Sequence, residues 1–237
     1  MKRTGTFLAL AVAAFTSVQA QYFCMANGTE LQYVNYDEVG QSTSTETVTV
    51  ADAVNKGGFQ GSAVYYVKVV NTKAKNNTTY TKFHWMYDGR NTVCVEDLMY
   101  GPYIASDSDP ARYSEEFRNA LLEDSKFKGD NSFTLDEQAK GGQTFPDRAY
   151  SYISNHLKKE VTVSGGSYLT PEEVSTTAGK FPCVKLTYLQ QTKILVKKET
   201  LRVTEWYAED IGLVKREAYT PKGQLRSRTL LTKVVEQ

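Results

Sequence analysis

Two alternating stretches decide the fold: residues 62–69 read SAVYYVKV, and residues 83–89 read FHWMYDG. Apolar side chains occupy every second position of the first stretch, and aromatic side chains do so in the second. A period of two is typical of a strand with one buried face. The Asp88-Gly89 pair that closes the second stretch is a strong signal for a tight hairpin turn. These stretches therefore predict a sheet that is built from hairpins.

The same pattern continues on both sides and predicts about ten strands. They span residues 31–36, 43–50, 63–69, 83–87, 93–98, 150–163, 181–188, 193–207, 212–219 and 225–235. We expect residues 37–40 and 220–223 to form tight turns, Gly165-Gly166 to end a strand, and residues 193–207 to form one long strand with a bulge. Because the links are of hairpin length and strands do not alternate with helices, an antiparallel sheet is favoured.

The centre of the chain differs from this pattern. Asp109 is a good helix N-cap and Pro110 suits the first helical position, so the sequence predicts a helix over residues 109–124. Residues 126–145 are polar and contain glycine, which favours a loop with a turn of helix around residues 135–139. The fold class is therefore mainly β: one antiparallel sheet with one or two short helices.

The first twenty residues have the pattern of a signal peptide. Lys2 and Arg3 are basic, residues 7–15 are apolar but too short to span a bilayer, and residues 18–20 place small side chains at a cleavage site. An N-terminal helix that stays in the fold is the alternative. Residues 1–20 are thus expected to be removed, which leaves residues 21–237 as one β-rich domain in the periplasm or outside the cell. Cys24 follows bulky residues, so we expect a soluble exported protein rather than a lipoprotein.

Net charge and hydrophobicity argue against several classes of function. The 237 residues carry 28 basic and 27 acidic side chains, for a net charge of +1, and loss of Lys2 and Arg3 leaves 26 against 27. A chain near neutrality lacks the basic footprint of a nucleic-acid-binding protein. No segment after residue 20 is apolar enough to span a membrane, so no membrane span is expected.

Three cysteines follow the signal sequence, and an exported protein can form disulfides. Cys94 and Cys183 lie in predicted strands, where a bridge between strands is feasible. The alternative is that all three, Cys24 included, are small buried hydrophobic residues.

Three segments carry a family resemblance. Residues 28–33 read GTELQY, residues 176–183 read TTAGKFPC, and EWY at residues 205–207 precedes IGLVK at residues 211–215. Together they resemble a secreted TapB-like family of Bacteroidetes-type bacteria, a domain of unknown function. The family's Pro-Ala-Gly-Thr-Phe pattern reads TAGKF at residues 177–181, so the match is imperfect. Such proteins are similar to the LolA-like lipoprotein carriers, and this implies a curved sheet or half-barrel around a helix.

The resemblance also suggests where a ligand would lie. In a half-barrel of this kind, Tyr113, Phe117 and Leu121 of the predicted helix would face the concave side of the sheet. Trp206 and Tyr207 lie beside the bend at Gly212. They are either a lip that contacts the ligand or core residues packed under a turn.

Residues that could support catalysis are sparse. His84 and His156 are the histidines of the chain, no serine lies in a nucleophile elbow, and metal-ligand spacing is absent. The sequence therefore predicts a non-enzymatic protein with no metal and no cofactor. Phe83, Trp85 and Tyr87 are either core residues or a platform for stacking sugars.

Three functions follow in order of preference. The first is an exported protein that binds a lipid-like ligand, or another small apolar or amphipathic one, on the concave side of the sheet. The second is a structural or interaction module that binds an envelope protein or glycan through its edge strands and the loop at residues 106–145. The third is an enzyme, which would need His84 or His156 buried beside a carboxylate or a cysteine.

Overall fold

The computed structural model describes residues 21–57, 60–72, 78–97, 126–153 and 158–236, and these form a single antiparallel sheet of 14 strands. The strands are β1 (Glu30–Asp37), β2 (Ser42–Gly57), β3 (Gln60–Asn71), β4 (Thr78–Tyr87), β5 (Asn91–Glu96), β6 (Lys126–Gly129), β7 (Ser132–Asp136), β8 (Thr144–Phe145), β9 (Arg148–Ile153), β10 (Lys158–Thr176), β11 (Gly179–Ile194), β12 (Lys197–Ala208), β13 (Gly212–Tyr219) and β14 (Leu225–Val235).

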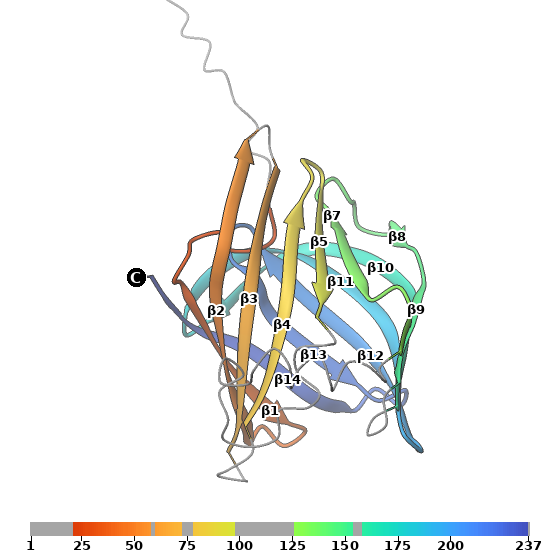
Figure 1. Cartoon of the computed structure of the whole chain (residues 1–237). Coiled ribbons are helices and arrows are strands. Elements are labelled where there is room, and N and C mark those ends of the chain that lie inside the picture. The colour runs from red at the N-terminus through yellow and green to blue at the C-terminus, as the bar shows by residue number, and fades with distance from the viewer. Residues whose placement is uncertain (1–20, 58–59, 73–77, 98–125, 154–157, 237) are drawn as a thin grey trace, which may run out of the picture.

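The sheet is formed by two runs of hairpins. Strands β9 to β14 follow one another in the sheet, β14 pairs with β1, and β1 to β5 continue the order, with β6 beside β9 and β7 beside β5 at the two edges. The sheet curls strongly, so that β2 to β5 stand opposite β10 to β12 (Figure 1). Aromatic contacts join the two sides: Trp85 of β4 lies 6.4 Å from Tyr207 of β12 between ring centroids, and Phe133 of β7 lies 5.7 Å from the same ring.

The alternating sequence explains which face is buried. In β3, Ala63, Tyr65 and Val67 are buried, while the residues between them are half-buried. Successive side chains of a strand point to opposite faces, so this alternation turns the apolar row toward the concave side. The core therefore lies inside the curl.

Residues 21–25 pack into one end of the curl. Phe23 is fully buried and stacks on Trp85, and the Tyr65 hydroxyl accepts a hydrogen bond from the Cys24 amide (2.5 Å) and donates one to the Cys24 carbonyl (3.1 Å). The Asp210 amide donates to the carbonyl of Gln21 (2.8 Å), so this segment also contacts the opposite side of the sheet.

Side-chain contacts join the two margins of the sheet. The Arg148 guanidinium of β9 donates to the Ser132 carbonyl of β7, and the Lys159 ammonium of β10 lies 3.5 Å from the Glu96 carboxylate of β5. At one rim the Asp136 amide donates to the Tyr168 hydroxyl of β10 (2.8 Å).

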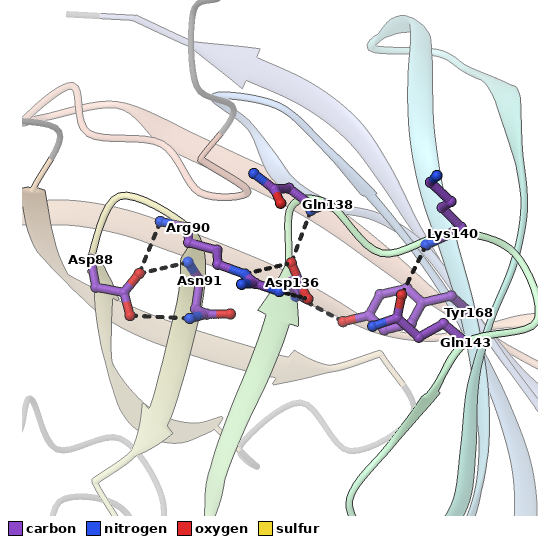
Figure 2. A network of polar contacts seen from close by, with 8 residues as sticks. All are labelled: Asp88, Arg90, Asn91, Asp136, Gln138, Lys140, Gln143 and Tyr168. Atoms are coloured by element: carbon purple, nitrogen blue, oxygen red, sulfur yellow. Dashed lines mark hydrogen bonds and ion pairs between the residues drawn. The ribbon is translucent and has the colours of Figure 1, made fainter.

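The same rim carries a network of polar residues around Asp136 (Figure 2). The Arg90 guanidinium reaches the Asp136 carboxylate (3.0 Å), and Asp88 accepts hydrogen bonds from the amides of Arg90 and Asn91 in the β4–β5 turn. The turn, the end of β7 and strand β10 are thereby held together.

Several sequence predictions are confirmed and others are wrong. The mainly β antiparallel fold and the turns at Gly40, Gly89 and Gly223, each with positive φ, are confirmed. The strand count of about ten is too low, because residues 126–145 form β6, β7 and β8 rather than a loop, and residues 137–138 are a turn rather than helical. The predicted helix at 109–124 lies outside the described residues, and no described residue is helical.

Three strand predictions are also wrong. Residues 150–163 do not form one strand, because β9 ends at Ile153 and β10 begins at Lys158. Strand β10 does not end at Gly165-Gly166, because a bulge with Gly165 at φ 61 lets it continue to Thr176. Residues 193–207 are not one strand: Leu195 adopts φ 53 and turns the chain from β11 into β12.

Candidate functional site

The concave side of the sheet lines a half-open cavity of about 420 Å³. Strands β2, β3 and β4 contribute Val48, Tyr65, Val67, Phe83 and Trp85 to its wall. Strands β7, β10 and β12 contribute Phe133, Val161, Val163 and Tyr207. A mostly apolar wall and a volume within about 300–1,000 Å³ are typical of small-molecule sites.

A buried carboxylate lies in this wall. Glu205 of β12 is 6% exposed and accepts three hydrogen bonds, from the hydroxyls of Tyr188 (3.0 Å) and Tyr207 (3.1 Å) and from Nε of Arg216 (3.1 Å). Each partner also lines the cavity. Because a buried charge is costly unless it is paired and hydrogen-bonded, the three donors explain how a carboxylate is accommodated here.

The ionisation of the cluster follows from its surroundings. Burial would lower the pKa of Arg216, but the neighbouring Tyr188 and Glu205 outweigh it and raise that pKa. Burial, reinforced by the charge of Glu205, raises the pKa of both Tyr188 and Tyr207. The tyrosines therefore stay neutral and act as hydrogen-bond donors, while Arg216 stays cationic.

Further charged groups line the cavity without forming a second cluster of this kind. Burial raises the pKa of Glu46, and an amide hydrogen bond from Asn35 and the charge of Arg216 offset only part of the effect. The guanidinium of Arg148 lies over the Phe133 ring, 4.8 Å from its centroid, and its Nε is buried without a hydrogen-bond partner. Within the described chain, no carboxylate lies within 4 Å of the Arg148 guanidinium.

The structure separates the two aromatic residues that the family resemblance suggested as a ligand lip. Tyr207 is buried and lines the cavity. Trp206 belongs to the opposite face, where the ammonium groups of Lys185 and Lys215 lie 5.1 and 4.3 Å from its ring centroid and its indole N–H donates to Glu172 (2.5 Å). Consecutive residues of a strand point to opposite faces, so only Tyr207 is placed to contact a ligand in the cavity.

The other aromatic candidates are divided similarly. Phe83 and Trp85 line the cavity, and Tyr87 is buried and donates a hydrogen bond to Glu137 (2.5 Å). They form part of the inner wall and not an exposed platform. Tyr113, Phe117 and Leu121 lie outside the described residues, so their predicted role stays a prediction.

The cysteines follow the second of the two alternatives that the sequence left open. Cys24, Cys94 and Cys183 are all buried free thiols, and the bridge between Cys94 and Cys183 is not formed. The physical reason is topological: Cys94 lies on β5 and Cys183 on β11, and these strands are not neighbours in the sheet. Burial raises the pKa of the Cys183 thiol to about 12.

The polar residues of the cavity are not among the site residues that the sequence predicts. In the sequence Glu205 belongs to a segment of the family resemblance, and Tyr188 and Arg216 belong to ordinary alternating strands. A signal was present, because Glu205 has the same strand parity as the buried Val203 and Tyr207. A charged residue in an otherwise apolar row of a strand indicates a buried polar partner or a binding site.

His84 does not belong to the cavity wall. It lies on β4 with its side chain 43% exposed, and its Nε2 is 3.8 Å from Oδ2 of Asp97. His156 lies outside the described residues. Among the residues that the structure describes, no group of three potential ligands is arranged to hold a metal ion. The described part of the chain has no helix that is long and apolar enough to cross a membrane.

These features define a class of fold: an open antiparallel sheet that curls over a partly polar cavity. The chain belongs to the DUF3108-like family, whose model matches residues 26–231. No protein with a curated description matches it.

Two solved structures share the fold. One is a protein from Bacteroides fragilis that is thought to be exported and has a YmcC-like fold, with a TM-score of 0.67, 20% identity, and coverage of 91% of this chain and 99% of that one. The other is a protein from Parabacteroides distasonis that is thought to be a lipoprotein, with a TM-score of 0.66, 17% identity and the same coverage. At these identities the likeness shows the fold alone. The resemblance to TapB-like and LolA-like proteins stays a prediction.

Proposed function

We propose that this chain is an exported, non-enzymatic binding protein that holds a small apolar or amphipathic ligand in the cavity of its curled sheet. The observation that carries the proposal is the cavity of about 420 Å³, with an apolar wall and the Glu205 cluster within it. Apolar surface would hold an acyl or ring portion of the ligand, and the few polar groups would orient it.

Export is supported by two observations. Residues 1–20 have the pattern of a signal peptide. The two solved structures of the same fold are described as proteins thought to be exported or to be lipoproteins. A location in the periplasm or outside the cell follows as part of the proposal.

Arg148 indicates which polar group the ligand would carry. The guanidinium of Arg148 lies at the cavity wall with one N–H unsatisfied, and it has no carboxylate partner among the described residues, whereas Arg216 and Lys159 have Glu205 and Glu96. Buried donors without partners favour a ligand that supplies an acceptor. An amphipathic ligand with an anionic group therefore suits this cavity.

Native mass spectrometry of freshly purified protein, together with titration by the hydrophobic dye anilinonaphthalene sulfonate, tests the proposal. We expect a non-covalent adduct that organic extraction removes, and saturable binding of one dye per chain. Val67→Phe, which extends a side chain into the cavity, should weaken dye binding. Val64→Phe, on the other face of the same strand, is the matched control and should leave it unchanged. Absence of both adduct and dye binding would overturn the proposal.

The alternative of an interaction module that works through its edge strands is less well supported. The edge strands β6 and β7 have four and five residues, and β6 carries Lys126 and Lys128. Short, lysine-bearing edges are features by which proteins prevent the addition of further strands.

A further inference from the structure

The β11–β12 hairpin ends in exposed aliphatic residues. Ile194 ends β11, Leu195 and Val196 form the turn, and Val196 is 92% exposed. The Leu195 amide donates to the carbonyl of Lys158 (2.9 Å), which fixes the turn against β10. Large aliphatic side chains that a fixed turn presents to water mark an interaction surface.

Two neighbouring strands extend this apolar surface. Ile153 of β9 and Phe127 of β6 are also large exposed hydrophobic residues. Ile153 is paired in register with Lys158, whose carbonyl holds the Leu195 amide. Phe127, Ile153 and residues 194–196 therefore lie at one end of the sheet, and we call them the apolar tip.

A set of lysines surrounds the apolar tip. They are Lys126, Lys128, Lys158, Lys193, Lys197 and Lys198. Register places three of them in one row, because Lys128, Ser151, Glu160, Lys193 and Lys198 are paired across β6, β9, β10, β11 and β12. Lys126 and Lys158 are both paired with Ile153, and Lys197 is paired with Ile194.

The charge of this end is strongly positive. Glu160 is the acidic residue of the row, and it lies between Lys158 (3.1 Å) and Lys193 (3.3 Å). Among the described residues of this end, the six lysines thus outnumber Glu160 and Glu199, and Glu199 is paired with Arg226, in a chain whose total charge is only +1. A near-neutral total conceals a local basic surface.

The apolar tip also borders the cavity. Lys159 lines the cavity and is paired in register with Ile194, and Thr192, on the same face of β11 two residues earlier, lines it as well. Phe23 and its neighbours pack at the other end of the curl. Any surface that the apolar tip contacts would therefore lie next to the cavity.

We propose that this end of the sheet docks on an anionic phospholipid bilayer, with the apolar tip among the headgroups and upper acyl chains and the six lysines against the lipid phosphates. Lysine is depleted at protein–protein interfaces, whereas tyrosine, tryptophan and arginine are enriched there, and the six cations here are all lysines. Apolar insertion combined with basic residues supplies the two signals that stable peripheral binding requires. The proposal stands on the surface alone and does not depend on whether the cavity binds a ligand.

Co-sedimentation with vesicles tests the proposal, using protein that begins at Gln21. Binding is compared between vesicles of phosphatidylglycerol and phosphatidylcholine in equal parts and vesicles of phosphatidylcholine alone. Each lysine near an anionic surface contributes about fivefold in affinity, so K197E/K198E should weaken binding to the anionic vesicles by at least about 25-fold. Val196→Asp should weaken it by at least about tenfold, because a charge replaces an inserted apolar side chain.

Matched controls keep the result interpretable. Val39→Asp changes another strongly exposed valine, 72% exposed, at the β1–β2 turn, and Lys222→Glu reverses an exposed lysine in the β13–β14 turn. Both controls should bind as the unchanged protein does, and circular dichroism should show that all variants are folded. Equal binding to neutral and anionic vesicles, no binding to either, or binding that V196D and K197E/K198E leave intact would each overturn the proposal.

Discussion

Replacement of Glu205 by glutamine is the perturbation whose effect the structure defines most closely. The carboxylate accepts hydrogen bonds from Tyr188, Tyr207 and Arg216, and its side chain is 8% exposed. A glutamine amide has one acceptor oxygen, so at least one of the three donors loses its partner. Arg216 also loses its counter-charge.

The magnitude follows from the burial of both partners. Removing one member of a buried ion pair costs about 3–5 kcal/mol, because the other charge is left uncompensated. The Arg216 side chain keeps 27% of its surface exposed, so solvent recovers part of this cost. We therefore expect Glu205→Gln to lower the free energy of unfolding by about 2–3 kcal/mol.

Glu199→Gln is the matched control, because it makes the same chemical change on the same strand. Glu199 pairs with Arg226 at 3.3 Å, but the two side chains are 55% and 52% exposed. An exposed pair of this kind contributes about 0–1 kcal/mol.

Urea unfolding followed by far-ultraviolet circular dichroism measures both variants. The double variant Glu205→Gln/Arg216→Gln should be less destabilised than the sum of its single changes, because removal of Arg216 removes the uncompensated charge. If the free energies of unfolding of E205Q and E199Q agree within about 0.5 kcal/mol, the Glu205 cluster does not have the role assigned to it.

Three further results are expected. Glu46→Gln should raise the free energy of unfolding at neutral pH and leave it unchanged in acid. Folding raises the pKa of Glu46, so the native state loses stability as pH rises through that pKa. A difference in free energy of unfolding between E46Q and the unchanged protein that is the same at every pH would contradict this. Thiol labelling should modify Cys94 and Cys183 only after unfolding, since both are buried free thiols, and an unreduced mass that showed a bridge between them would be incompatible with the fold. Gly129→Ala should lower the melting temperature more than Gly40→Ala does. Both glycines have positive φ, but only at Gly129 would the added methyl group fall on a backbone carbonyl of β9. Equal decreases in melting temperature would show that the β6–β9 edge has room for the methyl group.

The sequence predicts the hairpin regions well because their signals are local. Gly40, Gly89 and Gly223 occupy turns with positive φ, a conformation that glycine adopts without steric cost. Alternation in residues 62–69 assigns the buried face of β3 directly. Such signals depend only on residues next to one another in the chain.

The strands within residues 126–145 could not be predicted from such local signals. Strands β6, β7 and β8 have four, five and two residues, which is too short for a period of two to be recognised. Long-range contacts place β7: Arg148 reaches the Ser132 carbonyl, and the Asp136 amide donates to Tyr168. The turn at Leu195 was missed for a different reason, since a leucine in the left-handed region is uncommon and leaves no turn signal in the sequence.

The candidate site shows the same limit. Tyr207 was named from a resemblance, and the strand alternation that separates it from Trp206 was already present in the sequence. The partners of Glu205 on β11 and β13 become neighbours only when the sheet forms, because Tyr188 and Arg216 are 17 and 11 residues away along the chain. Cross-strand register, which sequence alone does not specify here, creates the polar cluster.

The central claim is that the cavity binds an amphipathic ligand, and the two tryptophans of the chain allow a direct test. Trp85 lines the cavity, whereas Trp206 lies on the opposite face. Titration with a spin-labelled fatty acid, followed by tryptophan fluorescence, compares Trp85→Phe with Trp206→Phe. Saturable quenching that persists in W206F and is lost in W85F is the predicted result. Quenching that does not saturate, or that arises equally from Trp206, would contradict binding in the cavity.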